Sequence, residues 1–82
     1  MQSKKLKTKE YTYTVIYEPV KEGGYQVVVP LLQGLVTYGR TFKEAREMAR
    51  DAIRCHIQGL LKDKQDIPQE KEIVQEKLSV SV

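Results

Sequence analysis

Cys55 and His56 are the residue types best suited to nucleophilic chemistry, because a thiolate can attack and an imidazole can take its proton. They are neighbours in a stretch whose spacing predicts a helix, where adjacent side chains diverge by about 100°. A nucleophile and its base must converge within hydrogen-bond reach, so the two are poor partners. Cys55 also has no second cysteine or histidine at ligand spacing, which leaves a zinc site unsupported.

The carboxylates offer no better catalytic set. Three lie on the expected helix and three near the first expected hairpin, and none forms the strand-centre cluster of two-metal hydrolysis; they are Glu44, Glu47 and Asp51, and Glu10, Glu18 and Glu22. No glycine-rich phosphate loop followed by Lys-Ser/Thr is present. We therefore expect a protein that is not an enzyme and that has no metal and no cofactor.

The length of 82 residues fits one small domain whose single core is only just sufficient. One cysteine cannot make an intramolecular disulfide, so self-association is an attractive way to bury more apolar surface. No apolar run approaches the roughly 20 residues of a membrane span, and the basic N-terminus lacks the apolar region of a secretory signal. We expect a cytoplasmic protein without a membrane partner.

Two groups of cations could contact nucleic acid. Residues 1–10 are expected to be a flexible basic arm, and a ridge of arginines recurs every four residues on the expected helix; the candidates are Lys4, Lys5, Lys7, Arg46, Arg50 and Arg54. Acids interleave with these arginines, which favours an ordinary solvated face with helix ion pairs. A stand-alone nucleic-acid-binding module is therefore kept as the alternative function and is not favoured.

Hydrophobic periodicity predicts a single α+β domain over residues 11–82. Alternating β-branched and aromatic residues predict strands over 11–18, 25–29 and 35–38, joined as an antiparallel meander. A helix is expected over 42–61, with an apolar stripe that includes Ala45 and Ala49 and packs on one face of the sheet. Alternation over 73–82 predicts a fourth strand. The expected order is β-β-β-α-β.

The corner between the third strand and the helix carries a capping box, Thr41-x-x-Glu44. The Thr41 hydroxyl can accept from the amide of Glu44, while the Glu44 carboxylate can reach back to the amide of Thr41. Gly39 suits a positive φ or a close approach to a neighbouring backbone. This corner fixes the fold and by itself names no function.

A family resemblance follows from the glycine, proline and threonine spacing. Gly23-Gly24-Tyr25-x-Val27-x-Val29-Pro30, Gly34-x-Val36-Thr37-x-Gly39-x-Thr41-x-x-Glu44-Ala45 and Ile67-Pro68 closely resemble the HicB antitoxin family. The resemblance implies a fold like a trimmed, inactive ribonuclease H. It also implies a function, neutralisation by direct binding of a HicA-type toxin, a small RNA-cleaving protein.

The sequence departs from the family pattern along one loop. Leu31 stands where the family usually has Asp, Leu35 where Cys is common, and Arg40 where Asp is usual. These changes exchange polar or acidic groups for apolar or basic ones. The expected partner-binding residues lie along this stretch: Leu31, Leu35, Tyr38 and Arg40.

The last expected strand presents Leu78, Val80 and Val82 on one face and carries no charge over 78–82. An exposed edge of this kind invites pairing with another chain. We therefore expect a homodimer or a dimer of dimers, with Leu78, Val80 and Val82 at the interface. The alternative is that this strand lies inside the sheet of a monomer.

Overall fold

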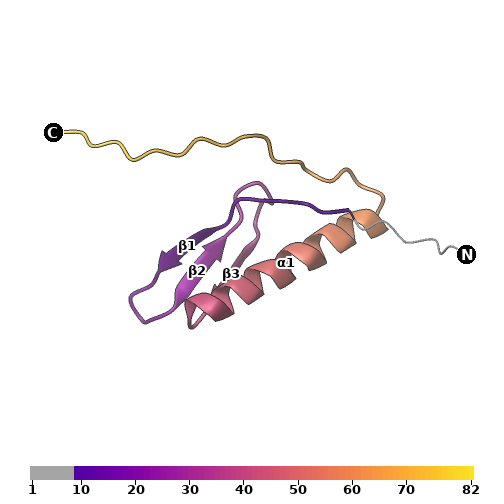
Figure 1. Cartoon of the computed structure of the whole chain (residues 1–82), viewed down its shortest axis with the longest axis horizontal. Coiled ribbons are helices and arrows are strands. Elements are labelled where there is room, and N and C mark those ends of the chain that lie inside the picture. Colours follow the sequence, from indigo (N-terminus) through magenta and orange to yellow (C-terminus); the bar gives the residue numbers. More distant parts are fainter. Residues whose placement is uncertain (1–8) are drawn as a thin grey trace, which may run out of the picture.

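The structure, a computed structural model, describes residues 9–82. Three strands precede one helix in the chain: β1 (Ile16–Pro19), β2 (Tyr25–Val28), β3 (Val36–Gly39) and α1 (Phe42–Lys62). The strands form an antiparallel meander in the order β1-β2-β3, and α1 packs across one face of it (Figure 1). This confirms the expected α+β class with a single helix on an antiparallel sheet.

The strand register decides which side chains face the helix. Val27 pairs with Tyr17 on one side and with Thr37 on the other, and this row faces α1. The adjacent row is Ile16, Val28 and Val36, which faces away from α1 because successive side chains of a strand alternate. β1 and β3 are the two edge strands of this sheet.

The core lies between β2 and the first half of α1. Val27, Ala45 and Ala49 are almost completely buried there, and the small alanine side chains let the helix lie close to the sheet. This confirms the expected alanine stripe. Leu32 adds a second buried anchor from the loop between β2 and β3.

The corner before α1 has the predicted cap with one correction. Thr41 is in extended conformation (φ −128°, ψ 166°), and the Glu44 amide donates to its hydroxyl over 3.0 Å. The Glu44 carboxylate, however, accepts from the amide of Arg40 over 2.5 Å and not from the expected amide of Thr41. The Glu44 carboxylate thus satisfies the amide of Arg40, one residue before the amide that we expected.

The first strand is shorter than expected. Residues 11–15 are extended but belong to no ladder, because β2 ends at Val28 and the chain turns away at Pro30. Val15 and Tyr17 still pack against the core. The alternating pattern of residues 11–18 therefore indicated burial of one face correctly and the length of the strand wrongly.

The expected fourth strand over 73–82 is wrong for a single copy of the chain. After α1 the described residues form no further strand, and residues 71–82 are exposed throughout. Figure 1 shows this segment running past the sheet and ending beyond it. Within residues 9–82 no strand is paired with it. The predicted basic arm, with Lys4, Lys5 and Lys7, lies outside the described residues except for Lys9 and Glu10.

Candidate functional site

An apolar hollow of about 610 Å³ lies beside the β3 edge. Its apolar lining comes from β3, from α1 and from the first hairpin loop: Val36, Tyr38, Met48 and Val20. Val36, Tyr38 and Met48 are 54%, 44% and 41% exposed. Large apolar side chains that gather at an unpaired strand edge are typical of surfaces that bind other proteins. We call this surface the β3 flank: it comprises Val36, Tyr38 and Met48 together with the neighbouring acids of α1, Glu44, Glu47 and Asp51.

The structure spreads the four expected partner-binding residues along β3. Leu31 and Leu35 precede the strand, Tyr38 lies within it, and Arg40 follows it. The structure therefore does not bring the four together, and only Tyr38 lines the hollow. Tyr38 is held in place, because its hydroxyl donates to the Gly23 carbonyl over 2.6 Å.

Arg40 is less available for a partner than its position suggests. Its side chain is highly exposed, and its Nε lies 3.7 Å from Glu44 Oε1. Its amide also donates to the same carboxylate. An exposed ion pair of this kind contributes little to the free energy of folding, so Arg40 could exchange Glu44 for a carboxylate of a binding partner.

The helix contributes acids to the β3 flank. Glu44 and Asp51 lie about one helical turn on either side of Met48, and Glu47 is its exposed neighbour. Asp51 approaches Arg54 at 3.5 Å, whereas Glu44 approaches Arg40. This flank therefore combines an exposed apolar patch with carboxylates.

Sequence reasoning missed Val36 and Met48 as surface residues. Val36 shares its face with Tyr38 at a spacing of two residues, a signal that the sequence already carried. Met48 lies at the margin of the apolar stripe of α1, where a side chain can be either covered or exposed. Only the position of the helix over the sheet decides that it is exposed.

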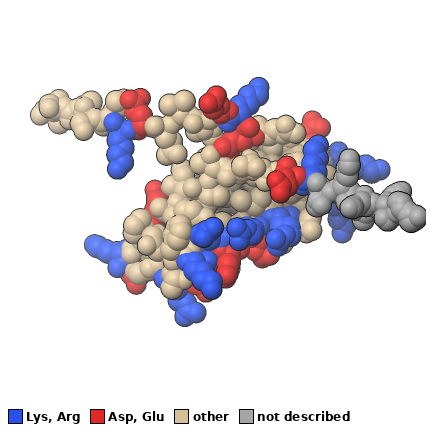
Figure 2. All heavy atoms as spheres, in the orientation of Figure 1, with Lys and Arg blue, Asp and Glu red and all other residues tan. Residues whose placement is uncertain are grey.

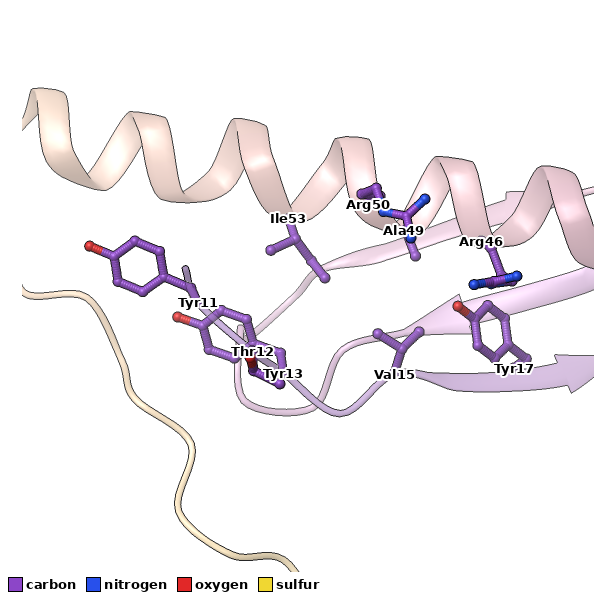
Figure 3. A pocket seen from close by; sticks show the side chains of 9 residues that line it. All are labelled: Tyr11, Thr12, Tyr13, Val15, Tyr17, Arg46, Ala49, Arg50 and Ile53. Carbon is purple, nitrogen blue, oxygen red and sulfur yellow. The ribbon is translucent and has the colours of Figure 1, made fainter. Parts of the chain in front are cut away.

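A second groove runs on the opposite flank, between α1 and the extended residues 11–15. It consists of two neighbouring cavities of about 330 and 560 Å³, which share Tyr11, Arg50 and Ile53 as lining residues. In Figure 3, Val15 points from the segment toward α1 and Ile53 points from α1 toward the segment. The apolar lining is Tyr11, Tyr13, Val15, Tyr17, Ala49, Ile53, Ile57 and Leu61. We call it the α1–β1 groove.

The three expected arginines of the helix lie along this groove. Arg46 and Arg50 line one part, and Arg50 and Arg54 line the other together with Lys9. Blue side chains gather along the helix in Figure 2, with red ones beside them. Arginines thus border this groove, whereas the acids Glu44 and Asp51 on the other side of α1 are each paired with an arginine.

A short strap ties the chain after α1 to residues 13–14. The Tyr13 hydroxyl donates to the Pro68 carbonyl over 2.5 Å, and the Thr14 amide donates to Glu70 Oε1 over 2.7 Å. The Thr14 hydroxyl also donates to the Glu70 carboxylate. Burial raises the pKa of the Tyr13 hydroxyl above its ordinary value, and the nearby Tyr11 and Glu70 raise it further.

The residues with catalytic potential are not brought together. Cys55 is exposed and free, and His56 is half-buried on the helix. Within residues 9–82 no group of three or more His, Cys, Asp or Glu side chains is arranged to hold a metal ion. Over the same residues, no helix has the length and apolar character needed to cross a membrane.

The fold and its surfaces define a small α+β module with two partly apolar surfaces, one at the β3 edge and one lined by arginines between α1 and residues 11–15. The family profile described as HicB_like antitoxin of bacterial toxin-antitoxin system matches residues 13–80. This match covers most of the chain, which therefore belongs to the HicB-like antitoxin family. It is an antitoxin module.

Individual relatives agree with the family assignment. The chain is 39% identical over 64 residues to a UPF0150 protein of Synechocystis sp., covering 78% of this chain and 81% of that one. It is 43% identical over 58 residues to a UPF0150 protein of Thermoplasma acidophilum, covering 71% and 84%. It is 42% identical over 60 residues to Antitoxin HicB 1 of Photorhabdus laumondii, covering 73% of this chain but 39% of that longer protein.

Proposed function

We propose that this chain neutralises a HicA-type, RNA-cleaving toxin by binding it directly through the β3 flank, without catalysis. Family membership supports the antitoxin role, and one structural observation carries the choice of surface. Val36, Tyr38 and Met48 are exposed together at an edge strand whose outer side has no partner within the described chain. Such a patch can bury its apolar area against a second protein.

Charge supports the same surface. A protein that cleaves RNA must attract phosphates, which requires a cationic face. The carboxylates around Met48 supply the complementary sign when the exposed pairs of Glu44 with Arg40 and of Asp51 with Arg54 exchange their arginine for a cation of the toxin, and such attraction speeds encounter and aligns the partners. Covering the cationic face of the toxin would also keep RNA away from it. The opposite, arginine-rich flank of α1 has the wrong sign for this contact.

Three further expectations belong to this proposal. The toxin acts on cellular RNA, so its antitoxin works in the cytoplasm. The antiparallel meander followed by one helix supports the implied kinship with a trimmed, inactive ribonuclease H. The chain acts as a homodimer or a dimer of dimers.

The test uses a small basic HicA-type protein, sought first in the genes next to this one, with affinity measured by calorimetry and function by rescue of growth. Met48→Lys and Val36→Lys place cations on the β3 flank at exposed positions that the fold tolerates. If these are central contacts, the double variant loses at least about thirtyfold in affinity and fails to rescue growth. The matched control is Ile73→Lys, an exposed apolar residue outside the sheet.

Unchanged affinity of the double variant would show that the toxin binds elsewhere. Equal loss in the Ile73→Lys control would show that added positive charge, and not the β3 flank, is responsible. No binding by the wild-type chain and no rescue would contradict the proposed function itself.

A further inference from the structure

Residues beyond the strap cannot all bury their apolar side chains against their own sheet. Tyr13 bonds Pro68 and Thr14 bonds Glu70, so the two segments run in the same direction where they meet. From Thr14 to the end of β1 at Pro19 the edge extends about 17 Å, whereas from Glu70 to Leu78 an extended chain covers about 26 Å at roughly 3.3 Å per residue. An extended segment therefore passes the end of its own sheet before Leu78.

The side chains beyond this point are exposed accordingly. Leu78 and Val80 are 78% and 84% exposed, and Val82 is fully exposed. Three aliphatic side chains on one face of an extended segment gain free energy when another molecule covers them. No neighbour within residues 9–82 covers them, so another molecule is the candidate cover.

Charge in this segment follows the same alternation as the apolar residues. As an extended strand, its even-numbered face carries only acids and aliphatic residues, and its odd-numbered face carries only cations and uncharged residues. The even face is Glu70, Glu72, Val74, Glu76, Leu78, Val80 and Val82. A surface that accepts the even face must be apolar with a basic rim.

The α1–β1 groove has this character. Its floor includes Ile53 and Ile57, and its rim carries Lys9, Arg50 and Arg54. It lies beside β1, whose outer edge pairs with no strand within the described residues. Bonded pairs alternate along an antiparallel ladder, and the bond from the Val20 amide to the Gly24 carbonyl places Ile16 and Glu18 in bonded pairs with β2; the amide and carbonyl of Tyr17 therefore face the outer edge. A strand added beside β1 could therefore form backbone hydrogen bonds with it and at the same time cover the α1–β1 groove.

We infer that the α1–β1 groove binds residues 76–82 of a second copy of this chain, reciprocally across a two-fold axis. Leu78, Val80 and Val82 lie over the apolar floor, and Glu76 faces the arginines of the rim. This inference deepens the proposed self-association and requires no toxin. It also leaves the β3 flank of each copy free for a different partner.

The test is the mass of the full chain in solution, measured without toxin by light scattering and by sedimentation over a range of concentrations. The wild-type chain gives about 19 kDa, twice the 9.5 kDa of one chain, or a multiple of that mass. Leu78→Ser combined with Val80→Ser raises the dissociation constant at least about a hundredfold, since each buried aliphatic side chain contributes to both reciprocal contacts. Ile73→Ser, the same kind of change on the odd face, leaves it within about threefold.

A charge exchange assigns the groove. Glu76→Arg alone and Arg50→Glu alone each weaken the dimer, and the two changes combined in one chain restore it, because every contact again joins opposite charges. These positions are solvent-exposed in one copy, so circular dichroism should show the wild-type fold for each variant. The restoration cannot arise from a merely structural role of either residue.

Four results would overturn the inference. They are a wild-type monomer at about 100 µM, a serine double variant that keeps its mass, a charge pair that is not restored, and a single-stranded oligoribonucleotide that displaces residues 76–82 from the groove. A wild-type monomer whose residues 76–82 become protected only when toxin is added would assign the segment to the toxin instead. Failure of toxin binding leaves these measurements unaffected, so the two proposals fail separately.

Discussion

Replacing Gly39 by alanine tests the tightest approach between the sheet and the helix. A Cβ at this position would lie 2.3 Å from the amide nitrogen of Ala45 and 2.4 Å from its Cα. Both are backbone atoms of the first helical turn, so no flexible side chain can move aside. To restore an ordinary contact of 3.4 Å, the start of α1 would have to retreat by about 1 Å.

That retreat loosens the contact of Ala45 and Ala49 with Val27 and disturbs the cap at Thr41. Overpacking usually costs about 1–3 kcal/mol, and the rigidity of the contact places Gly39→Ala at the upper end. For a domain of this size the melting temperature should fall by roughly 12–24 °C, since 1 kcal/mol corresponds to about 4–8 °C. Thermal and urea unfolding followed by circular dichroism measure the loss.

Gly59→Ala is the matched control. Gly59 lies within α1, and an added Cβ would meet nothing within 4 Å. The same chemical change should therefore stabilise the chain, by up to about 1 kcal/mol through helix propensity. A Gly39→Ala variant as stable as the wild type would refute the close packing of α1 on β3.

Three further changes probe the cap, the core and the strap. Thr41→Ala removes the acceptor of the Glu44 amide and should cost about 1 kcal/mol in unfolding free energy, whereas an unchanged urea midpoint would mean that the helix starts elsewhere. Ala49→Leu forces methylenes into a buried contact and should cost about 1–3 kcal/mol, a loss absent if Ala49 faced solvent. Tyr13→Phe removes the bond to Pro68 and should cost about 1 kcal/mol near pH 8. Because the folded pKa of Tyr13 is raised, the wild-type advantage is complete below pH 10 and is lost as the pH rises through that pKa; a constant advantage at higher pH would contradict this.

Local chemistry explains which parts of the fold were predictable. The Thr41 cap, the alanine stripe and the helix of residues 42–62 depend on neighbours within a few positions, and each was predicted closely. The meander was also predictable, because glycines at positive φ join β1 to β2. The bond from Glu44 to the Arg40 amide was not, since either neighbouring amide satisfies the same side chain.

The remaining errors concern contacts between distant segments. The pattern of residues 11–15 indicates a buried face but cannot say that β2 ends too early to pair with it. Alternation at Leu78 and Val80 likewise predicted a strand, which is wrong for this copy because a strand also needs a neighbour to pair with, and the local pattern does not say whether one exists. The exposure of Val36 and Met48 follows from where α1 lies across the sheet, which no local pattern encodes.

Amide hydrogen exchange of the chain alone and in the presence of a HicA-type toxin tests the central claim most directly. The account predicts that toxin adds protection to the amides of Val36–Gly39 that do not pair with β2 and to the turn of α1 around Met48. Protection at residues 11–15 and 76–82 should already be present without toxin. New protection confined to the α1–β1 groove, with β3 unchanged, would contradict the claim that the β3 flank binds the toxin.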